Sequence, residues 1–182
     1  MAINVTKPTE DALQALVHDA FETNAILDRV KTVTTTTLAF PIFGNYIHLL
    51  AHKYAINIGD GVGDLLEKYN EPVNYGDIPK HVEEYFNIQE AIDKVYNSVL
   101  TYQNELNQCA KIAFDNMDLH IYEGILEIIK EHNKYVEQAI LWKDIADRYK
   151  DSPSLDVHSE HYNILGEWLW LLEKFQAIFQ NI

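Results

Sequence analysis

The sequence has one cysteine, Cys109, and this scarcity limits its covalent chemistry. A single thiol cannot form a disulfide within the chain, and a chain without disulfides is typical of a reducing cytoplasm. Cys109 lies in an apolar stretch beside Ala110, so we expect it to be a small core residue. The cysteine content therefore favours a cytoplasmic protein.

Helix-breaking residues and long apolar runs are also scarce. Five prolines and seven glycines in 182 residues leave room for long uninterrupted helices, and an apolar fraction of 47% excludes disorder. No run of eighteen apolar residues could span a membrane, and the N-terminus MAINVTKPTED lacks the pattern of a signal peptide. We expect one domain with no membrane segment.

Basic residues are few: 14 stand against 28 acidic residues, which gives a net charge of −14. Such a surface repels polyphosphate and disfavours nucleic-acid binding driven by counterion release. The charge serves solubility, or it attracts cations such as iron to an acidic assembly.

The segment 46–71 predicts a helix of roughly 40 Å, a length natural for a helical bundle. Its apolar residues are spaced by three and four, and they are Ile47, Leu50, Ala51, Tyr54, Ile58, Val62, Leu65 and Tyr69. A second face carries two glycines, Gly59 and Gly63, which indicate that another backbone packs closely there. The same face carries histidines and carboxylates, the ligands of hard or borderline metals: His48, His52 and Glu67, with Asp60 and Asp64 at its margin.

Apolar periodicity predicts three further long helices, over 8–35, 89–114 and 119–150. The β-branched run 34–37 is interpreted as the last helical turns of the first helix, and 40–45 as the turn into the second. Residues 71–80 hold two prolines and a glycine and predict a long connection, with a short amphipathic helix over 79–86.

The C-terminal part is predicted to be a polar linker over 151–158 and a helix over 159–180 with Ser159 as its N-cap. Trp168 and Trp170 fall on different sides of that helix, so one packs on the bundle and the other suits a subunit contact. The fold class is therefore all-α: a four-helix bundle over 1–150 with a crossover between its second and third helices, and an amphipathic fifth helix within 151–182.

A di-iron site inside a bundle would need Glu-x-x-His on two helices, and this chain has none. The residues three positions before His48, His52, His120 and His132 are Asn45, Leu49, Met117 and Ile129. The segment holding Asp156, His158 and His161 could chelate a surface metal, although ordinary linker histidines are the commoner reading. No nucleophilic triad or phosphate-binding loop is present.

Three segments together carry a family resemblance: GDIPKHVEEYFNIQE (76–90), VGDLLEKY (62–69) and IIKEHNKYVEQAILW (128–142). In order and spacing they resemble the Dps family, mini-ferritins that protect DNA during starvation, over roughly residues 12–150. The resemblance implies a ferritin-like subunit, a hollow homo-dodecamer and a short helix across the bundle in the long connection.

The resemblance also implies iron ligands at a seam between two subunits. Aligned without gaps, His48, His52 and Glu67 fall on ligand positions of that family. Thr36 and Gly63 stand where two other ligands belong, and Thr37 replaces a tryptophan. Asp60 or Asp64 could replace the missing carboxylate. The resemblance thus implies a weak or atypical iron site, and the alternative is a half-buried subunit face without metal.

A second set of acidic residues matches the family's iron-admitting three-fold pore: Asp118, Glu123 and Glu127. Repeated three times, Glu123 and Glu127 would form a negative ring that concentrates Fe²⁺. The alternative interpretation is a solvated helix face.

The resemblance implies a cytoplasmic mini-ferritin that oxidises Fe²⁺ with peroxide or oxygen, stores the iron and protects DNA. The family's lysine-rich tail is absent, since only Lys7 precedes Asp11, so DNA contact would rely on weak multivalent binding by residues such as Lys143 and Lys150. Two alternatives stay open: a shell-forming or DNA-binding protection protein that has lost efficient iron oxidation, and an acidic helical adaptor that forms no shell.

Overall fold

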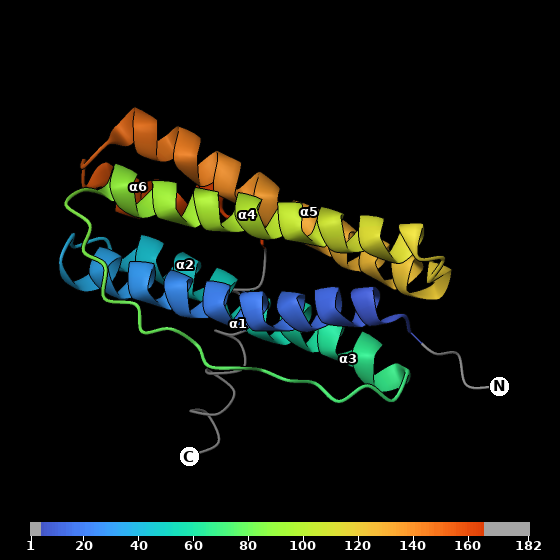
Figure 1. Cartoon of the computed structure of the whole chain (residues 1–182). Coiled ribbons are helices and arrows are strands. Elements are labelled where there is room, and N and C mark those ends of the chain that lie inside the picture. Colours follow the sequence, from blue (N-terminus) through green and yellow to red (C-terminus); the bar gives the residue numbers. More distant parts are fainter. Residues whose placement is uncertain (1–4, 166–182) are drawn as a thin grey trace, which may run out of the picture.

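The computed structural model describes residues 5–165, and every regular element in that range is helical (Figure 1). The elements in chain order are α1 (Lys7–Thr36), α2 (Pro41–Lys53), the π-helical turn η1 (Tyr54–Gly59), α3 (Asp60–Lys68), α4 (Ile88–Asp115), α5 (Leu119–Tyr149), α6 (Ser154–His158) and the 3₁₀ turn η2 (Ser159–Tyr162). No helix within 5–165 is long and apolar enough to cross a membrane.

Two helical hairpins form the bundle. The first pairs α1 with the continuous rod α2–η1–α3, and the second pairs α4 with α5. Because α3 and α4 run in the same direction, the chain between them returns along the whole length of the bundle, as the green segment in Figure 1 shows. The predicted four-helix bundle with a crossover is confirmed.

The connection itself differs from the prediction, because residues 79–86 form no helix. Residues 71–87 must travel about as far as the 30-residue α1 is long, roughly 45 Å. An extended chain of that length reaches about 55 Å, whereas eight helical residues within it would shorten it to about 40 Å. The Arg29 guanidinium also donates to the carbonyls of Glu83 and Val82, at 2.8 and 3.3 Å, and so holds that backbone in an extended conformation against α1.

The turn between α1 and α2 is shorter than predicted. Helix α1 ends at Thr36, as the β-branched run suggested, but α2 already begins at Pro41, which suits the first turn of a helix. The two helices meet closely at Gly44, where a Cβ would lie 2.2 Å from Thr35 Oγ1. Any larger residue would force Thr35 to move, so Gly44 allows α2 to cross α1 closely at this point.

The second rod keeps its predicted apolar positions through the π-helical turn and changes only near its end. Ile47 and Leu50 before the turn, Ile58 within it and Val62 after it are all buried. The next core residue is Leu66, four positions after Val62. The predicted core residue Leu65 is only partly buried.

The glycine face does not meet another backbone, contrary to the prediction. A Cβ on Gly59 would lie 2.9 Å from Phe21 Cε2, and a Cβ on Gly63 would lie 3.5 Å from Val73 Cγ2. A side chain of α1 and one from the connection therefore cover this face within the same subunit.

The predicted polar linker over 151–158 contains the short helix α6. Leu155 is buried, and Asp156 Oδ1 accepts a hydrogen bond from the Phe43 backbone N–H at 2.8 Å, which docks α6 onto α2. Ser159 is not an N-cap, because its hydroxyl donates to the Asp156 carbonyl at 2.7 Å. Most of the predicted tail helix, with Trp168 and Trp170, lies outside the described residues.

The centre of the bundle is aromatic. Tyr54, Tyr102, His132 and Tyr135 are fully buried and their rings contact one another. His132 Nδ1–H donates to Gln103 Oε1 at 2.6 Å, so its Nε2 accepts from the Tyr54 hydroxyl at 2.7 Å. Burial lowers the pKa of His132 to about 3, which keeps the ring neutral. The Tyr135 hydroxyl also donates to Glu131 Oε1 at 3.4 Å, at the edge of this cluster, while the centre is occupied by the tyrosine rings and neutral His132.

We expect Tyr54→Phe to destabilise the protein by about 1–3 kcal/mol, because His132 Nε2 would be left buried without a donor. Tyr85→Phe is the matched control, since the Tyr85 hydroxyl is buried without a hydrogen-bond partner and its loss should cost less than about 0.5 kcal/mol. Urea denaturation of both variants measures the difference. Equal losses would contradict the role of the Tyr54–His132 bond.

Candidate metal-binding sites

The predicted seam residues lie on the second rod, His48 and His52 on α2 and the three carboxylates on α3. Asp60, Asp64 and Glu67 are exposed. Within one subunit, the described residues bring none of these carboxylates into a metal-binding group with the two histidines.

The two histidines have a different partner, Asp28 on α1. His48 Nδ1 lies 2.6 Å from Asp28 Oδ1, and His48 Nε2 lies 3.0 Å from His52 Nε2. A carboxylate only accepts, so Nδ1 carries the proton and Nε2 keeps a lone pair. This arrangement orients His48 as a carboxylate orients a metal-binding histidine. Sequence reasoning missed Asp28 because it is 20 residues away on a neighbouring helix.

The three predicted pore residues have different surroundings. Asp118 is only 4% exposed and accepts from Thr6, through the hydroxyl at 2.6 Å and the backbone N–H at 3.2 Å. Glu123 is exposed, and exposed Glu127 lies 3.6 Å from Lys130 Nζ. Asp118 thus connects the start of α1 to the start of α5. The exposed Glu123 and Glu127 are still candidates for the predicted pore lining.

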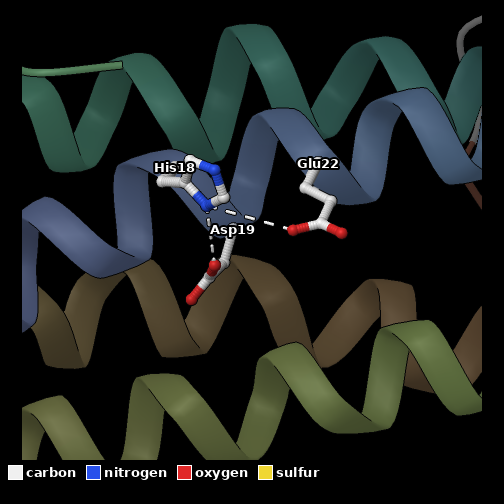
Figure 2. A group of neighbouring side chains, drawn as sticks. All are labelled: His18, Asp19 and Glu22. Carbon is white, nitrogen blue, oxygen red and sulfur yellow. Dashed lines mark hydrogen bonds and ion pairs between the residues drawn. The ribbon is translucent and has the colours of Figure 1, made fainter. Parts of the chain in front are cut away.

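A third group, which sequence reasoning did not find, lies on α1: His18, Asp19 and Glu22 (Figure 2). One potential ligand atom from each lies within 4.8 Å of the others. His18 Nδ1 is 3.1 Å from Asp19 Oδ1 and 3.9 Å from Glu22 Oε2. All three residues are partly buried. We call this group the α1 cluster.

The His18 ring presents its acceptor nitrogen to the two carboxylates. Its Nε2 lies 3.1 Å from the Asp77 carbonyl, which can only accept, so Nε2 carries the proton. Nδ1 of a neutral ring then faces carboxylate oxygens, which cannot donate either. Either a second proton or a cation must sit between them, and the hydrogen bonds to Asp19 and then to the Asp77 carbonyl raise the pKa of His18. The α1 cluster is therefore arranged around a positive charge.

A groove between α1 and α4 adjoins the cluster. It has a volume of about 280 Å³, and Asp19, Glu22 and Glu105 are among its lining residues. Burial, followed by the negative charges of Asp19 and Glu22, raises the pKa of Glu105 to about 7. Three carboxylates with few neighbouring cations give this groove a strong preference for a cation.

The α1 cluster could have been found from its spacing. In the segment HDAFE, His18 and Glu22 are one helical turn apart and Asp19 is adjacent, so all three lie on one side of a helix. Sequence reasoning instead followed the second rod, because the family resemblance places its ligands there.

No protein-family model matches the sequence, and no curated protein does. Solved structures do match. An open pore ferritin from the hyperthermophilic archaeon Archaeoglobus fulgidus superposes with a TM-score of 0.81 at 10% identity, covering 89% of this chain and 99% of that chain. The protein has a ferritin-like fold. A humanized archaeal ferritin gives a TM-score of 0.77 at 12% identity, covering 88% of this chain and 98% of that chain.

These likenesses place the chain among ferritin-like bundles at the level of fold. They agree with the ferritin-like architecture that the Dps resemblance implied, while the Dps subfamily itself stays a hypothesis. Within the described part of this ferritin-like chain, the His/carboxylate group that fits a metal is the partly buried α1 cluster.

Asp118 provides a pH-dependent test of how the ends of α1 and α5 are held. Burial opposes the charged form, but hydrogen bonds from Thr6 and Thr9 outweigh it and lower the pKa of Asp118. Its stabilisation is thus present at neutral pH and is lost as the pH falls through and below the usual carboxyl range. We expect Asp118→Asn to cost about 1.5–3 kcal/mol at pH 7 and clearly less near pH 3.

The measurement is urea denaturation of the Asp118→Asn variant at both pH values. Asp115→Asn is the control, because exposed Asp115 pairs only with exposed Lys111 and should contribute little at either pH. A loss at Asp118 that does not change with pH would show that shape, rather than charge, matters there.

Proposed function

We propose that this protein is a ferritin-like iron protein that binds Fe²⁺ at the α1 cluster and oxidises it. The observation that carries the proposal is the convergence of His18, Asp19 and Glu22 beside an acidic groove. The ferritin neighbours support iron as the metal, and a set of one imidazole and two carboxylates suits Fe²⁺ among the first-row metals.

Iron is the substrate in this proposal. With peroxide as oxidant, two Fe²⁺ each lose one electron, and H₂O₂ with two protons becomes two water molecules. The carboxylates of Asp19 and Glu22 stabilise Fe³⁺ more than Fe²⁺ because of its higher charge, which favours oxidation. Glu105, whose pKa lies near neutrality, stands in the same groove and can release its proton when a cation approaches.

The finer proposal is a Dps-like homo-dodecamer that stores iron and protects DNA from oxidative damage. Large apolar side chains at the α4–α5 turn are exposed and would gain from burial between subunits: Phe114, Met117 and Leu119, at 53%, 72% and 47%. Glu123 follows them on α5 and would line an acidic entry formed by neighbouring subunits, with Glu127 one turn further on.

A second iron site at the subunit seam belongs to the same proposal. His48 and His52 would supply the nitrogen ligands, and Asp60, Asp64 or Glu67 of a neighbouring copy would supply the oxygens. The Asp28–His48 hydrogen bond supports this proposal, because it puts the proton on Nδ1 and directs the Nε2 lone pair toward His52 Nε2, where a metal could replace the hydrogen bond between the two rings.

The second candidate function is a DNA-shielding shell with little iron oxidation. The separation of His48 and His52 from the α3 carboxylates within one subunit favours it. The net charge of −14 means that DNA would be held by weak contacts repeated over many subunits.

The α1 cluster is tested by Glu22→Gln, which keeps the shape of the side chain and removes its charge. We expect Fe²⁺ affinity, measured anaerobically by calorimetry, to fall at least tenfold, and the initial rate of oxidation to fall with it. Glu137→Gln is the control, because Glu137 is an exposed carboxylate on α5 away from the cluster. Unchanged affinity in Glu22→Gln would refute iron binding at the α1 cluster.

The double variant His48→Ala, Glu67→Ala separates the two candidate functions. We expect it to slow the iron oxidation that remains in Glu22→Gln if the seam holds iron, and to leave it unchanged if the protein only shields DNA. Gel filtration with light scattering follows protein mass and iron together after loading with Fe²⁺ and peroxide. A dodecamer without iron would favour DNA shielding, and a monomer or dimer would refute the shell.

A further inference from the structure

The connection 71–87 lies along α1 and is held there by side chains of that helix. Gln14 donates to the Pro72 carbonyl at 2.7 Å and accepts from the Asn74 N–H at 2.9 Å. His18 bonds the Asp77 carbonyl, and Arg29 bonds the carbonyls further along. The α1 cluster therefore lies beneath a segment that begins about 50 residues later in the chain.

One side chain of the connection, His81, turns inward toward the cluster. It is 11% exposed, and its Nδ1 lies 3.3 Å from Glu83 Oε1. Its Nε2 is buried without a hydrogen-bond partner and lies 3.9 Å from Glu22 Oε1. A buried ring nitrogen without a partner is costly unless something occupies the space beside it.

His81 and His18 share one electrostatic arrangement. Each ring uses one nitrogen as donor to an oxygen that only accepts, the Glu83 carboxylate or the Asp77 carbonyl. Each then directs its other nitrogen at one oxygen of Glu22, at 3.9 Å in both cases. Two acceptor nitrogens on either side of one carboxylate form no favourable contact until a proton or a metal cation enters.

The separations around Glu22 and Asp19 fit a shared ion. With bonds of about 2.1 Å, two ligands of one metal lie about 3.0 Å apart when adjacent and at most about 4.2 Å apart when opposite. His18 Nδ1 lies 3.1 Å from Asp19 and 3.9 Å from Glu22, and His81 Nε2 lies 3.9 Å from Glu22. His81 stands just outside the group whose ligand atoms all lie within 4.8 Å of one another, so its ring would move inward when a metal binds. The outer hydrogen bonds at Asp77 and Glu83 fix which nitrogen of each ring faces the ion, as outer partners of metal-binding histidines do.

We propose that His81 is the fourth ligand of the α1 cluster, so that a divalent metal bound by His18, Asp19, Glu22 and His81 clamps the connection onto α1. This inference rests on the proposed function, since it concerns the same metal site. Two imidazoles and two carboxylates suit Fe²⁺, Mn²⁺ or Zn²⁺. Metal binding then has a structural consequence, because it stabilises an extended segment that few hydrogen bonds hold.

The test uses Mn²⁺, which does not complicate the measurement by oxidising under the assay conditions. Calorimetry compares the full-length protein with His81→Ala, His18→Ala and the control Lys80→Ala, whose exposed side chain neighbours His81. Hydrogen exchange of residues 76–84 is measured with and without Mn²⁺. We expect His81→Ala to weaken Mn²⁺ binding at least tenfold and to abolish the metal-induced protection, while Lys80→Ala keeps both.

The outcomes separate this inference from the proposed function. If His18→Ala abolishes binding and His81→Ala leaves affinity and protection unchanged, the connection supplies no ligand, although the α1 cluster still binds metal. If neither variant changes the affinity, both proposals fail. Paramagnetic broadening of the His81 ring signals by Mn²⁺ in the wild-type protein checks direct ligation, and its absence would refute it.

Discussion

The structure depends on one topological constraint: α3 and α4 run in the same direction. The chain must therefore return along the full length of the bundle between them, outside the core. That path requires an extended connection, and α1 supplies the side chains that hold it, with Gln14, His18 and Arg29 all bonding its backbone. The same path covers the glycine face of the second rod and brings His81 to Glu22. A constraint on chain direction thus places a candidate ligand beside a cluster far from it in sequence.

The aromatic centre of the bundle explains why metal chemistry is proposed at its surface. Burying carboxylates in the interior would cost several kcal/mol for each unpaired charge, unless a resident metal offsets it. Here Tyr54, Tyr102 and Tyr135 surround a neutral His132 and their rings pack against it. The buried His132 nitrogens are paired through the Tyr54–His132–Gln103 hydrogen bonds. The carboxylates that would bind iron lie instead in the groove between α1 and α4, where water can share the cost of their charge.

Periodicity predicted the elements that local sequence determines. The four long helices, the buried Cys109 and the helical end of the 34–37 run are confirmed, because each depends on apolar spacing or local backbone preference. The extended form of 79–86 depends on the distance to be spanned and on Arg29. The burial of Leu66 rather than Leu65 depends on how α3 packs, since both lie within one turn of buried Val62. The site residues follow the same rule. Partners within one turn, such as His18 and Glu22, were accessible to sequence reasoning, whereas Asp28 beside His48 and His81 beside Glu22 required the tertiary structure.

The two histidine-containing clusters differ in donor chemistry, and this difference would favour different metals at the two proposed sites. Around Glu22 there are at least as many carboxylates as imidazoles, and the site is partly buried and strongly negative. Such a site favours a hard divalent ion and stabilises its oxidised form. The Nε2 atoms of His48 and His52 lie 3.0 Å apart at the surface, and Asp28 bonds the other nitrogen of His48. Two imidazole ligands alone prefer Zn²⁺ or Cu²⁺ unless carboxylate ligands are added. Iron at the seam therefore depends on subunit assembly, because only a neighbouring copy can bring Asp60, Asp64 or Glu67 to the histidines. Iron at the proposed α1 site would need no partner subunit, since one chain supplies all four candidate ligands.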